Sequence, residues 1–115
     1  QQQWSKLREY IYKMYSAGVL LTSGSDFPNP WVVPGISLHQ ELKLLNDCGI
    51  PPLEVIKIAT YNGAIALGMQ DITGTVEANK LANLVVLEKN PAEDILHTQS
   101  IIWVYKNGKV VRTEQ

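Results

Sequence analysis

Apolar residues recur at helical spacing in three stretches of the first half of the chain. The apolar stripes are Leu7, Ile11 and Met14, then Leu38, Leu42 and Leu45, and then Ile56, Ala59 and Gly63. They predict amphipathic helices over residues 5–17, 37–48 and 52–67. Ser5 and Ser37 stand where the first two helices would begin, and a serine hydroxyl there can accept from an unpaired backbone N–H.

A short, mostly apolar run lies between the first two predicted helices. It follows Gly18, which can take the left-handed conformation after a helix end, and it predicts a strand over residues 19–23. A continuous run of this kind is typical of a parallel strand buried on both faces, and such sheets place their chemistry at the carboxyl ends of the strands. Asp26 follows that end after two small residues. It is placed to hold a metal or take a proton, and the alternative is that it caps whatever follows.

The pattern changes after Met69. Residues 74–77, 83–88, 101–105 and 109–112 are predicted strands, since they are short and rich in β-branched or aromatic residues. Asn107-Gly108 is a strong signal for a type I′ hairpin turn between the last two. The second half of the chain is therefore predicted to be antiparallel β structure.

The predicted strand over residues 19–23 is the single parallel-type strand in this pattern. A strand buried on both faces needs a neighbour on each side, and helices cannot supply one. We therefore expect these residues to belong to a larger α/β body. The alternative is an independent α+β domain of 115 residues.

Composition excludes several classes of function. The hydrophobic fraction of 45% and the charged fraction of 18% are typical of a folded globular chain. The net charge is −1, with 10 basic and 11 acidic residues and no basic run, so nothing favours binding to nucleic acid or to an anionic membrane. Cys48 is the one cysteine, which excludes a disulfide framework and a paired-cysteine zinc site within this chain. No stretch approaches the ~18 consecutive apolar residues of a membrane span.

Two features near Asp26 are candidates for substrate contact. Residues 27–35 form a loop stiffened by three prolines, and it carries the aromatic side chains Phe27 and Trp31. Such a loop could wall a pocket or simply pack against the rest of the protein. His39 follows near the start of the next predicted helix, where it could face a substrate or serve in packing.

A series of motifs runs in order along residues 19–111. They are Val19-Leu-Leu-Thr-Ser-Gly-Ser-Asp26, Gly35-Ile-Ser-Leu-His-Gln-Glu-Leu42, Gly49-Ile-Pro-Pro-Leu-Glu-Val-Ile-Lys-Ile-Ala-Thr-Tyr-Asn-Gly-Ala64, Leu67-Gly68, Gly74-Thr-Val-Glu77, Lys80-Leu-Ala82, Leu84-Val-Val-Leu87, Asn90-Pro91 and Val104-Tyr-Lys-Asn-Gly-Lys-Val-Val111. Each motif is weak alone, but the ordered set is specific. It resembles the C-terminal part of the metal-dependent amidohydrolase superfamily, in its imidazolonepropionase-like and prolidase-like (Xaa-Pro dipeptidase-like) branch.

This resemblance implies an α/β fold, a (β/α)8 TIM barrel with a β-sandwich beside it. Residues 1–68 would be the last barrel units, and residues 69–115 the C-terminal share of the sandwich. Within the family the aspartate at the end of the last strand binds the metal and accepts a proton from the attacking water, and only that role maps here, onto Asp26. The implied cofactor is a divalent metal, zinc first among them. His39 and His97 do not form the family's His-x-His pair, and a catalytic zinc needs ~3 protein ligands.

The expected activity is hydrolysis of a C–N bond in a small amide, a cyclic amide or a dipeptide. This chain alone is expected to be inactive, and the rest of the barrel or an oligomer partner would complete the site. The alternative is a non-catalytic α+β module that binds a small ligand or a partner through the proline-rich loop. The chain departs from the family pattern at Asn79 and Asn83, which replace a glycine and an aspartate, and at Pro51, which takes the place of a capping Thr or Ser.

Overall fold

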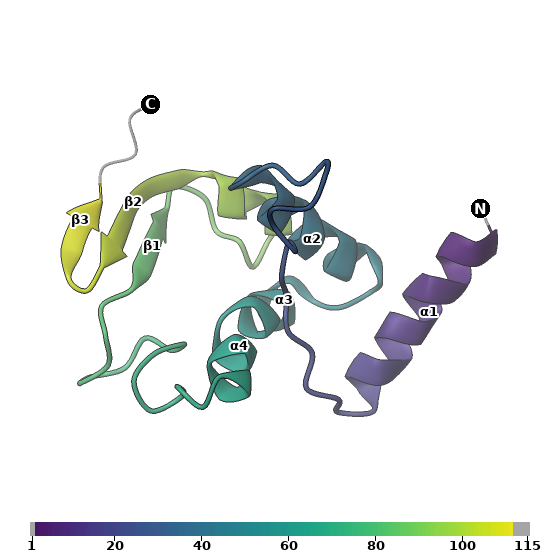
Figure 1. Ribbon diagram of the computed structural model, residues 1–115, viewed down its shortest axis with the longest axis horizontal. Coiled ribbons are helices and arrows are strands. Elements are labelled where there is room, and N and C mark those ends of the chain that lie inside the picture. The colour runs from purple at the N-terminus through teal and green to yellow at the C-terminus, as the bar shows by residue number, and fades with distance from the viewer. Residues whose placement is uncertain (1, 112–115) are drawn as a thin grey trace.

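The computed structural model describes residues 2–111. The helices are α1 (Gln2–Ser16), α2 (Ile36–Asp47), α3 (Pro52–Ala59), α4 (Tyr61–Ala66) and the 3₁₀ helix η1 (Ile95–Gln99), and the strands are β1 (Leu84–Leu87), β2 (Ile101–Lys106) and β3 (Lys109–Val111). Helix α1 lies at one end of the molecule, the sheet at the other, and α2, α3 and α4 between them (Figure 1). None of the helices in the described part is long and apolar enough to cross a membrane.

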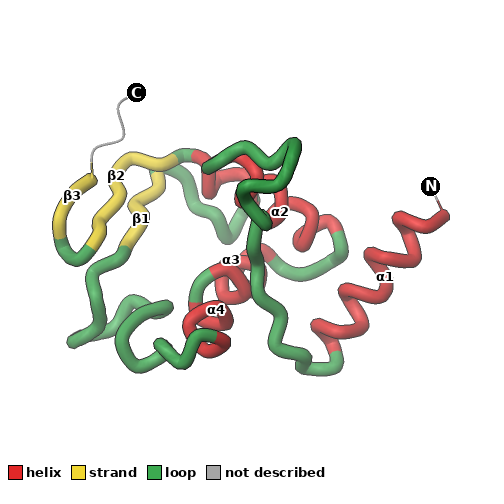
Figure 2. The backbone as a smooth tube through the Cα atoms, in the orientation of Figure 1, coloured by secondary structure: helices red, strands yellow, loops and turns green. Residues whose placement is uncertain are grey.

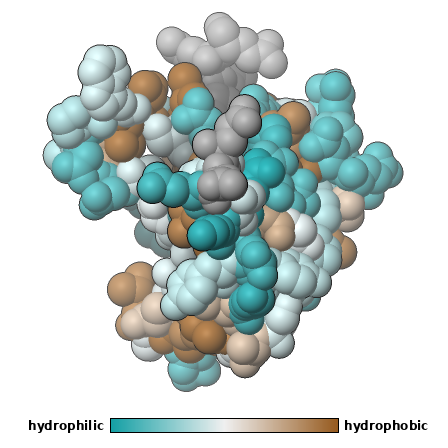
Figure 3. All heavy atoms as spheres, turned by 90° about the vertical axis from the view of Figure 1, so that its right-hand side faces the viewer, coloured by the Kyte–Doolittle hydropathy of each residue, from teal (hydrophilic) through white to brown (hydrophobic). Residues whose placement is uncertain are grey.

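The hydrophobic core is small and lies between α2, α3 and η1. Its buried members are Leu42, Ile50, Val55, Ile58 and Ile95. Ile11, Tyr15 and Leu21 pack against its edge, so α1 and the segment after it join the core from one side. Many other large apolar side chains are at the surface, among them Leu20, Val76, Val85, Val86, Ile102 and Trp103. Figure 3, seen from the α1 side, shows apolar side chains reaching the surface.

Helix α1 ends at the predicted glycine. Gly18 has φ +78°, its N–H donates to the Tyr15 carbonyl oxygen, and the N–H of Val19 donates to that of Met14. These are the paired bonds of a Schellman motif, which a left-handed glycine makes possible. The start of the helix was wrongly predicted, because α1 begins at Gln2 and Ser5 lies within it.

The predicted cap of α2 is also wrong. The helix begins at Ile36 after Gly35, and no side chain caps it. The Ser37 hydroxyl instead accepts from the Val33 N–H at 2.8 Å, while the Ser37 N–H donates to the Val33 carbonyl oxygen at 3.0 Å. Ser37 therefore fastens the loop before the helix rather than the helix itself, because its side chain reaches back toward that loop.

The predicted helix over residues 52–67 is broken at Thr60, where φ is −125° and ψ is −80°. The Thr60 hydroxyl donates to the Ile56 carbonyl oxygen at 2.8 Å, a local bond that competes with regular helix geometry. The buried face also differs from the predicted one, and its members lie on both sides of the break. The side chains that are buried belong to Val55, Ile58, Asn62 and Ala64, and not to the predicted stripe.

Two predicted strands are not strands. Residues 19–23 are extended but make no ladder, because the described residues supply no strand beside them. This segment rises from the end of α1 past α3 toward the loop that precedes α2 (Figure 2). Residues 74–77 form a turn region in which Gly74 has φ +98°, a conformation that a regular strand does not contain.

The remaining strands form an antiparallel three-stranded sheet in the order β1-β2-β3. Val85 pairs with Val104, and Tyr105 pairs with Val110. Asn107 and Gly108 both have positive φ, 50° and 75°, which is the geometry of the predicted type I′ turn. The predicted last strand extends to residue 112, which lies outside the described residues.

Candidate active site

Two long-range hydrogen bonds hold the segment that leads to Asp26. The side-chain amide of Asn62, on α4, donates to the Leu21 carbonyl oxygen at 2.9 Å. The N–H of Gly24 donates to Oε1 of Glu41, on α2, at 2.9 Å. The segment is thus fastened at one point to each of two helices, and Asp26 follows the second point by two residues.

Asp26 is exposed and has φ +56°, an uncommon conformation for a residue with a side chain. Its Oδ2 accepts from the side-chain amide of Asn29 at 2.5 Å, and its carbonyl oxygen accepts from the Asn29 N–H at 3.1 Å. The carboxylate does not cap α2, which begins only at Ile36. The Asn29 contact uses Oδ2, so Oδ1 is the oxygen that a cation or a water could take.

The proline-rich loop displays its aromatic residues outward. Trp31 is 99% exposed and Phe27 is 60% exposed, so neither is held in the core. Trp31 has φ +71°, and the loop is turned there by a bond from the Val32 N–H to the Asn29 carbonyl oxygen. Because Asn29 also contacts Asp26, the base of this loop is joined directly to the candidate carboxylate.

His39 joins α2 to η1. Its Nδ1 lies 3.0 Å from Oγ1 of Thr98, and that hydroxyl donates its own proton to the Ile95 carbonyl oxygen. With its own proton engaged, the hydroxyl can accept from Nδ1–H of His39, and in the neutral imidazole Nε2 is then the nitrogen without a proton. A shallow hollow at the start of α2 is lined by Gly35, Ile36, His39 and Gln99. His97 is engaged elsewhere, with Nδ1 2.7 Å from the Asn90 carbonyl oxygen.

The number of possible metal ligands in this chain decides whether it could hold a metal alone. Among residues 2–111, no group of three or more His, Cys, Asp or Glu side chains comes together in a way that could hold an ion. Asp26 fits a catalytic cation as one ligand, and the other ligands would have to come from outside the described residues. Cys48 is not an activated nucleophile, since partial burial raises the pKa of its thiol above the ordinary value.

Comparison with known proteins decides the family. A sequence model of the amidohydrolase family matches residues 5–111. The chain belongs to the amidohydrolase family. It is 33% identical to ochratoxinase of Aspergillus niger over 95% of this chain and 24% of that protein. It is also 33% identical to imidazolonepropionase of Fusobacterium nucleatum subsp. nucleatum, over 86% of this chain and 25% of the relative.

Solved structures of amidohydrolases contain the same fold as one part of a longer protein. A Xaa-Pro dipeptidase with methionine bound in its active site superposes with a TM-score of 0.82 and 28% identity, over 92% of this chain and 25% of that one. A putative prolidase from Bifidobacterium longum gives 0.81 and 31%, over 88% and 25%. The resemblance expected from the ordered motifs is thus confirmed, and the chain spans about a quarter of the length of these amidohydrolases.

The sequence patterns did not identify Glu41 or Asn62 as functional residues. Both lie inside family-like motifs, Glu41 in Gly35–Leu42 and Asn62 in Gly49–Ala64. The one signal in the sequence for either residue is that a polar side chain lies within a family-like motif on a predicted helix. Only the tertiary structure shows that both side chains reach the backbone before Asp26.

Proposed function

We propose that this chain is the C-terminal part of a metal-dependent amidohydrolase, called the parent enzyme below, which hydrolyses C–N bonds in small amides, cyclic amides or dipeptides. Residues 1–68 would supply the last units of its (β/α)8 barrel, and residues 69–115 the C-terminal share of its β-sandwich. The observation that carries the proposal is the family match over residues 5–111. The exposed Asp26 carboxylate also supports it, because it follows a segment that Glu41 and Asn62 hold by hydrogen bonds to Gly24 and Leu21.

Asp26 is the proposed catalytic residue and metal ligand of this chain. A bound divalent cation such as zinc supplies a water whose pKa is lowered towards ~7. The Asp26 carboxylate would be one ligand of that cation, and as a general base it would take a proton from the activated water and return it to the leaving nitrogen. The hydrogen bond from Asn29 to Oδ2 would orient the carboxylate for this role.

Trp31 and His39 are the proposed substrate contacts. The fully exposed indole of Trp31 stands on the loop that Asn29 joins to Asp26, so it can cover an apolar part of a substrate. His39 is one of the residues that line the hollow at the start of α2, where its Nε2 would accept a hydrogen bond from a substrate amide. Thr98 fixes the imidazole in that orientation.

The rest of the site would come from other parts of the parent enzyme. The segment before Asp26 has no neighbouring strand among residues 2–111, and apolar side chains such as Val76 and Ile102 lie exposed. Both features are expected of one part of a larger α/β body, in which adjoining units cover these surfaces.

The test uses the parent enzyme, expressed from the longest reading frame that contains this sequence. It is loaded with zinc, manganese or cobalt and assayed on N-acyl amino acids, Xaa-Pro dipeptides and cyclic amides. We expect metal-dependent hydrolysis of at least one class, and a loss of about 10²–10⁴-fold in kcat for Asp26→Asn with the fold retained. The matched control is Asp71→Asn, which removes the charge of an exposed aspartate in the second half of the chain. This variant should stay active.

Near-normal turnover by Asp26→Asn would contradict the role assigned to Asp26. Absence of C–N hydrolysis with every metal would contradict the enzymatic proposal itself. Ligand binding that depends on Trp31 in such an inactive protein would favour the alternative of a non-catalytic module.

A further inference from the structure

We propose that Glu41 and Asn62 are positioning residues that hold the backbone carrying Asp26 in its working place. The inference rests on the proposed function of Asp26. It extends that function to two side chains on two different helices, neither of which is assigned to metal or substrate.

The geometry of the two contacts is complementary. Glu41 accepts from the Gly24 N–H and Asn62 donates to the Leu21 carbonyl oxygen, both at 2.9 Å. Together they satisfy one donor and one acceptor of an extended segment that makes no strand ladder among residues 2–111. Backbone groups of this kind must find partners, and these two side chains supply partners for the Gly24 N–H and the Leu21 carbonyl oxygen.

Both side chains project from well-anchored positions. Glu41 precedes Leu42, which is 5% exposed and belongs to the core, and Asn62 is itself 9% exposed beside the buried Ala64. A hydrogen bond to an ionised carboxylate is stronger than a neutral one, and a buried amide is costly to leave unpaired. The two bonds therefore hold the segment at a fixed position relative to α2 and α4.

The position of the Asp26 carboxylate depends on this segment. Asp26 lies two residues after Gly24 and has φ +56°. The direction of its side chain therefore depends on where the backbone of Gly24 is held. Release of Gly24 or Leu21 would let the carboxylate shift relative to the rest of the site. A misplacement of about 1 Å can cost about 10²-fold in rate.

The conservative substitution at Glu41 separates positioning from direct chemistry. Glutamine keeps a side-chain oxygen that can accept from the Gly24 N–H, but it removes the negative charge. A positioning role survives Glu41→Gln and is lost in Glu41→Leu. A role for the charge, as a metal ligand or a proton acceptor, is lost in both variants.

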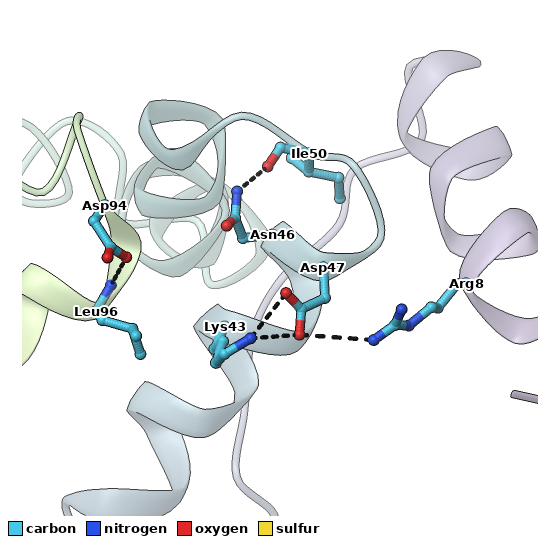
Figure 4. Close-up of polar contacts among 7 residues, drawn as sticks. All are labelled: Arg8, Lys43, Asn46, Asp47, Ile50, Asp94 and Leu96. Atoms are coloured by element: carbon cyan, nitrogen blue, oxygen red, sulfur yellow. Dashed lines mark hydrogen bonds and ion pairs between the residues drawn. The ribbon is translucent and has the colours of Figure 1, made fainter. Parts of the chain in front are cut away.

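The experiment uses the parent enzyme and compares Glu41→Gln, Glu41→Leu and Asn62→Leu with the unmodified protein. The matched control is Asn46→Leu on the same helix. The Asn46 side-chain amide also donates to a backbone carbonyl oxygen, that of Ile50 at 2.9 Å, near the C-terminal end of α2 (Figure 4). The readouts are kcat, KM, the thermal midpoint and amide hydrogen exchange of residues 19–26.

For Glu41→Leu and Asn62→Leu we expect kcat to fall about 10- to 100-fold with KM changed less than about threefold, and exchange of residues 19–26 to accelerate. Glu41→Gln should retain kcat to within about threefold and keep the exchange protection. Asn46→Leu should lower the thermal midpoint and leave kcat and this exchange unchanged. If Glu41→Leu does not fold, Glu41→Asp, which is one methylene too short to reach Gly24, takes its place.

Unchanged kcat in Glu41→Leu, equal losses in the Gln and Leu variants, or unaltered exchange of residues 19–26 would each overturn the inference. The proposed function fails by a different result, an unmodified parent enzyme that hydrolyses none of the amides or an Asp26→Asn variant that stays active. In that case the exchange data alone decide whether Glu41 and Asn62 hold the segment.

Discussion

Gly74 lies directly against Ala64 of α4. A Cβ built on Gly74 would be 2.7 Å from the Cβ of Ala64 and 3.2 Å from the Cα of Tyr61, and Gly74 also has φ +98°. The loop after α4 therefore folds back and packs against α4, the helix that carries Asn62. Only a residue without a side chain permits this approach.

Gly74→Ala should destabilise the parent enzyme by about 2–5 kcal/mol, because it adds a left-handed alanine, about 1–2 kcal/mol, to an overpacked contact, about 1–3 kcal/mol. Gly18→Ala is the control. Gly18 has φ +78° but nothing within 4 Å of its added Cβ, so it should show the backbone cost alone. Thermal unfolding of both variants checks this, and an equal drop in their midpoints would show that the contact with Ala64 is unimportant.

The same loop is held by Lys80. Its ammonium donates to the Gln70 carbonyl oxygen at 2.8 Å and to the Thr75 hydroxyl at 2.6 Å, and it pairs with the Glu77 carboxylate at 2.8 Å. The side-chain hydrogen bond from Lys80, followed by that with Thr75, holds the pKa of Glu77 below its ordinary value of 4.5. The folded form thus favours the ionised carboxylate.

A depressed pKa in the folded protein means that Glu77 stabilises the fold above about pH 4.5 and loses this contribution as the pH falls through the folded pKa. The difference in thermal midpoint between the unmodified parent enzyme and Glu77→Gln should therefore shrink between about pH 6 and pH 3.5. Glu88→Gln, in an exposed glutamate outside this cluster, is the control. A difference that stays constant with pH would contradict the role of Lys80.

Trp31→Ala should weaken substrate binding without harming the fold. The side chain is 99% exposed, so its removal costs no packing, whereas loss of one aromatic contact should raise KM about 2- to 10-fold. Steady-state kinetics and the thermal midpoint measure the two effects. Trp4→Ala, on the remote helix α1 where the indole stacks with Arg8, should leave KM unchanged. Equal KM values for Trp31→Ala and the unmodified enzyme would remove Trp31 from the substrate site.

The isolated 115-residue chain should be inactive with added zinc and should associate with itself. Asp26 is the one candidate ligand identified in the described part, and the outer edges of β1 and β3 have no strand beside them there. Activity assays and size-exclusion chromatography with light scattering check both statements, with the parent enzyme run in parallel. A monodisperse, active monomer would contradict the proposal that the site needs further parts of the protein.

Local signals in the sequence predicted the features that depend on local conformation. Gly18 ends α1 in a Schellman motif, which needs one left-handed residue, and Asn107-Gly108 forms the type I′ hairpin turn, which needs two. Asn79, which stands in place of the family's glycine, also has a left-handed φ of +70°, a conformation that asparagine tolerates. The docking of this hairpin was not foreseen. The Asn83 side chain accepts from the Asn107 N–H at 2.9 Å, at the end of the β1–β2 ladder.

The sequence by itself indicated which stretches of the first half are helical, the antiparallel character of the second half and, through ordered motifs, the family to which the chain belongs. It also singled out Asp26. It did not fix where α1 and α2 begin, the break at Thr60 or the 3₁₀ helix η1. Only the tertiary structure showed that side chains of α2 and α4 reach the backbone before Asp26, and that His39 contacts Thr98 on η1. The reason is physical. Helix periodicity and turn conformation depend on neighbouring residues, whereas the bond between Asn62 and Leu21 joins groups 41 residues apart and exists only once α4 has packed beside that segment.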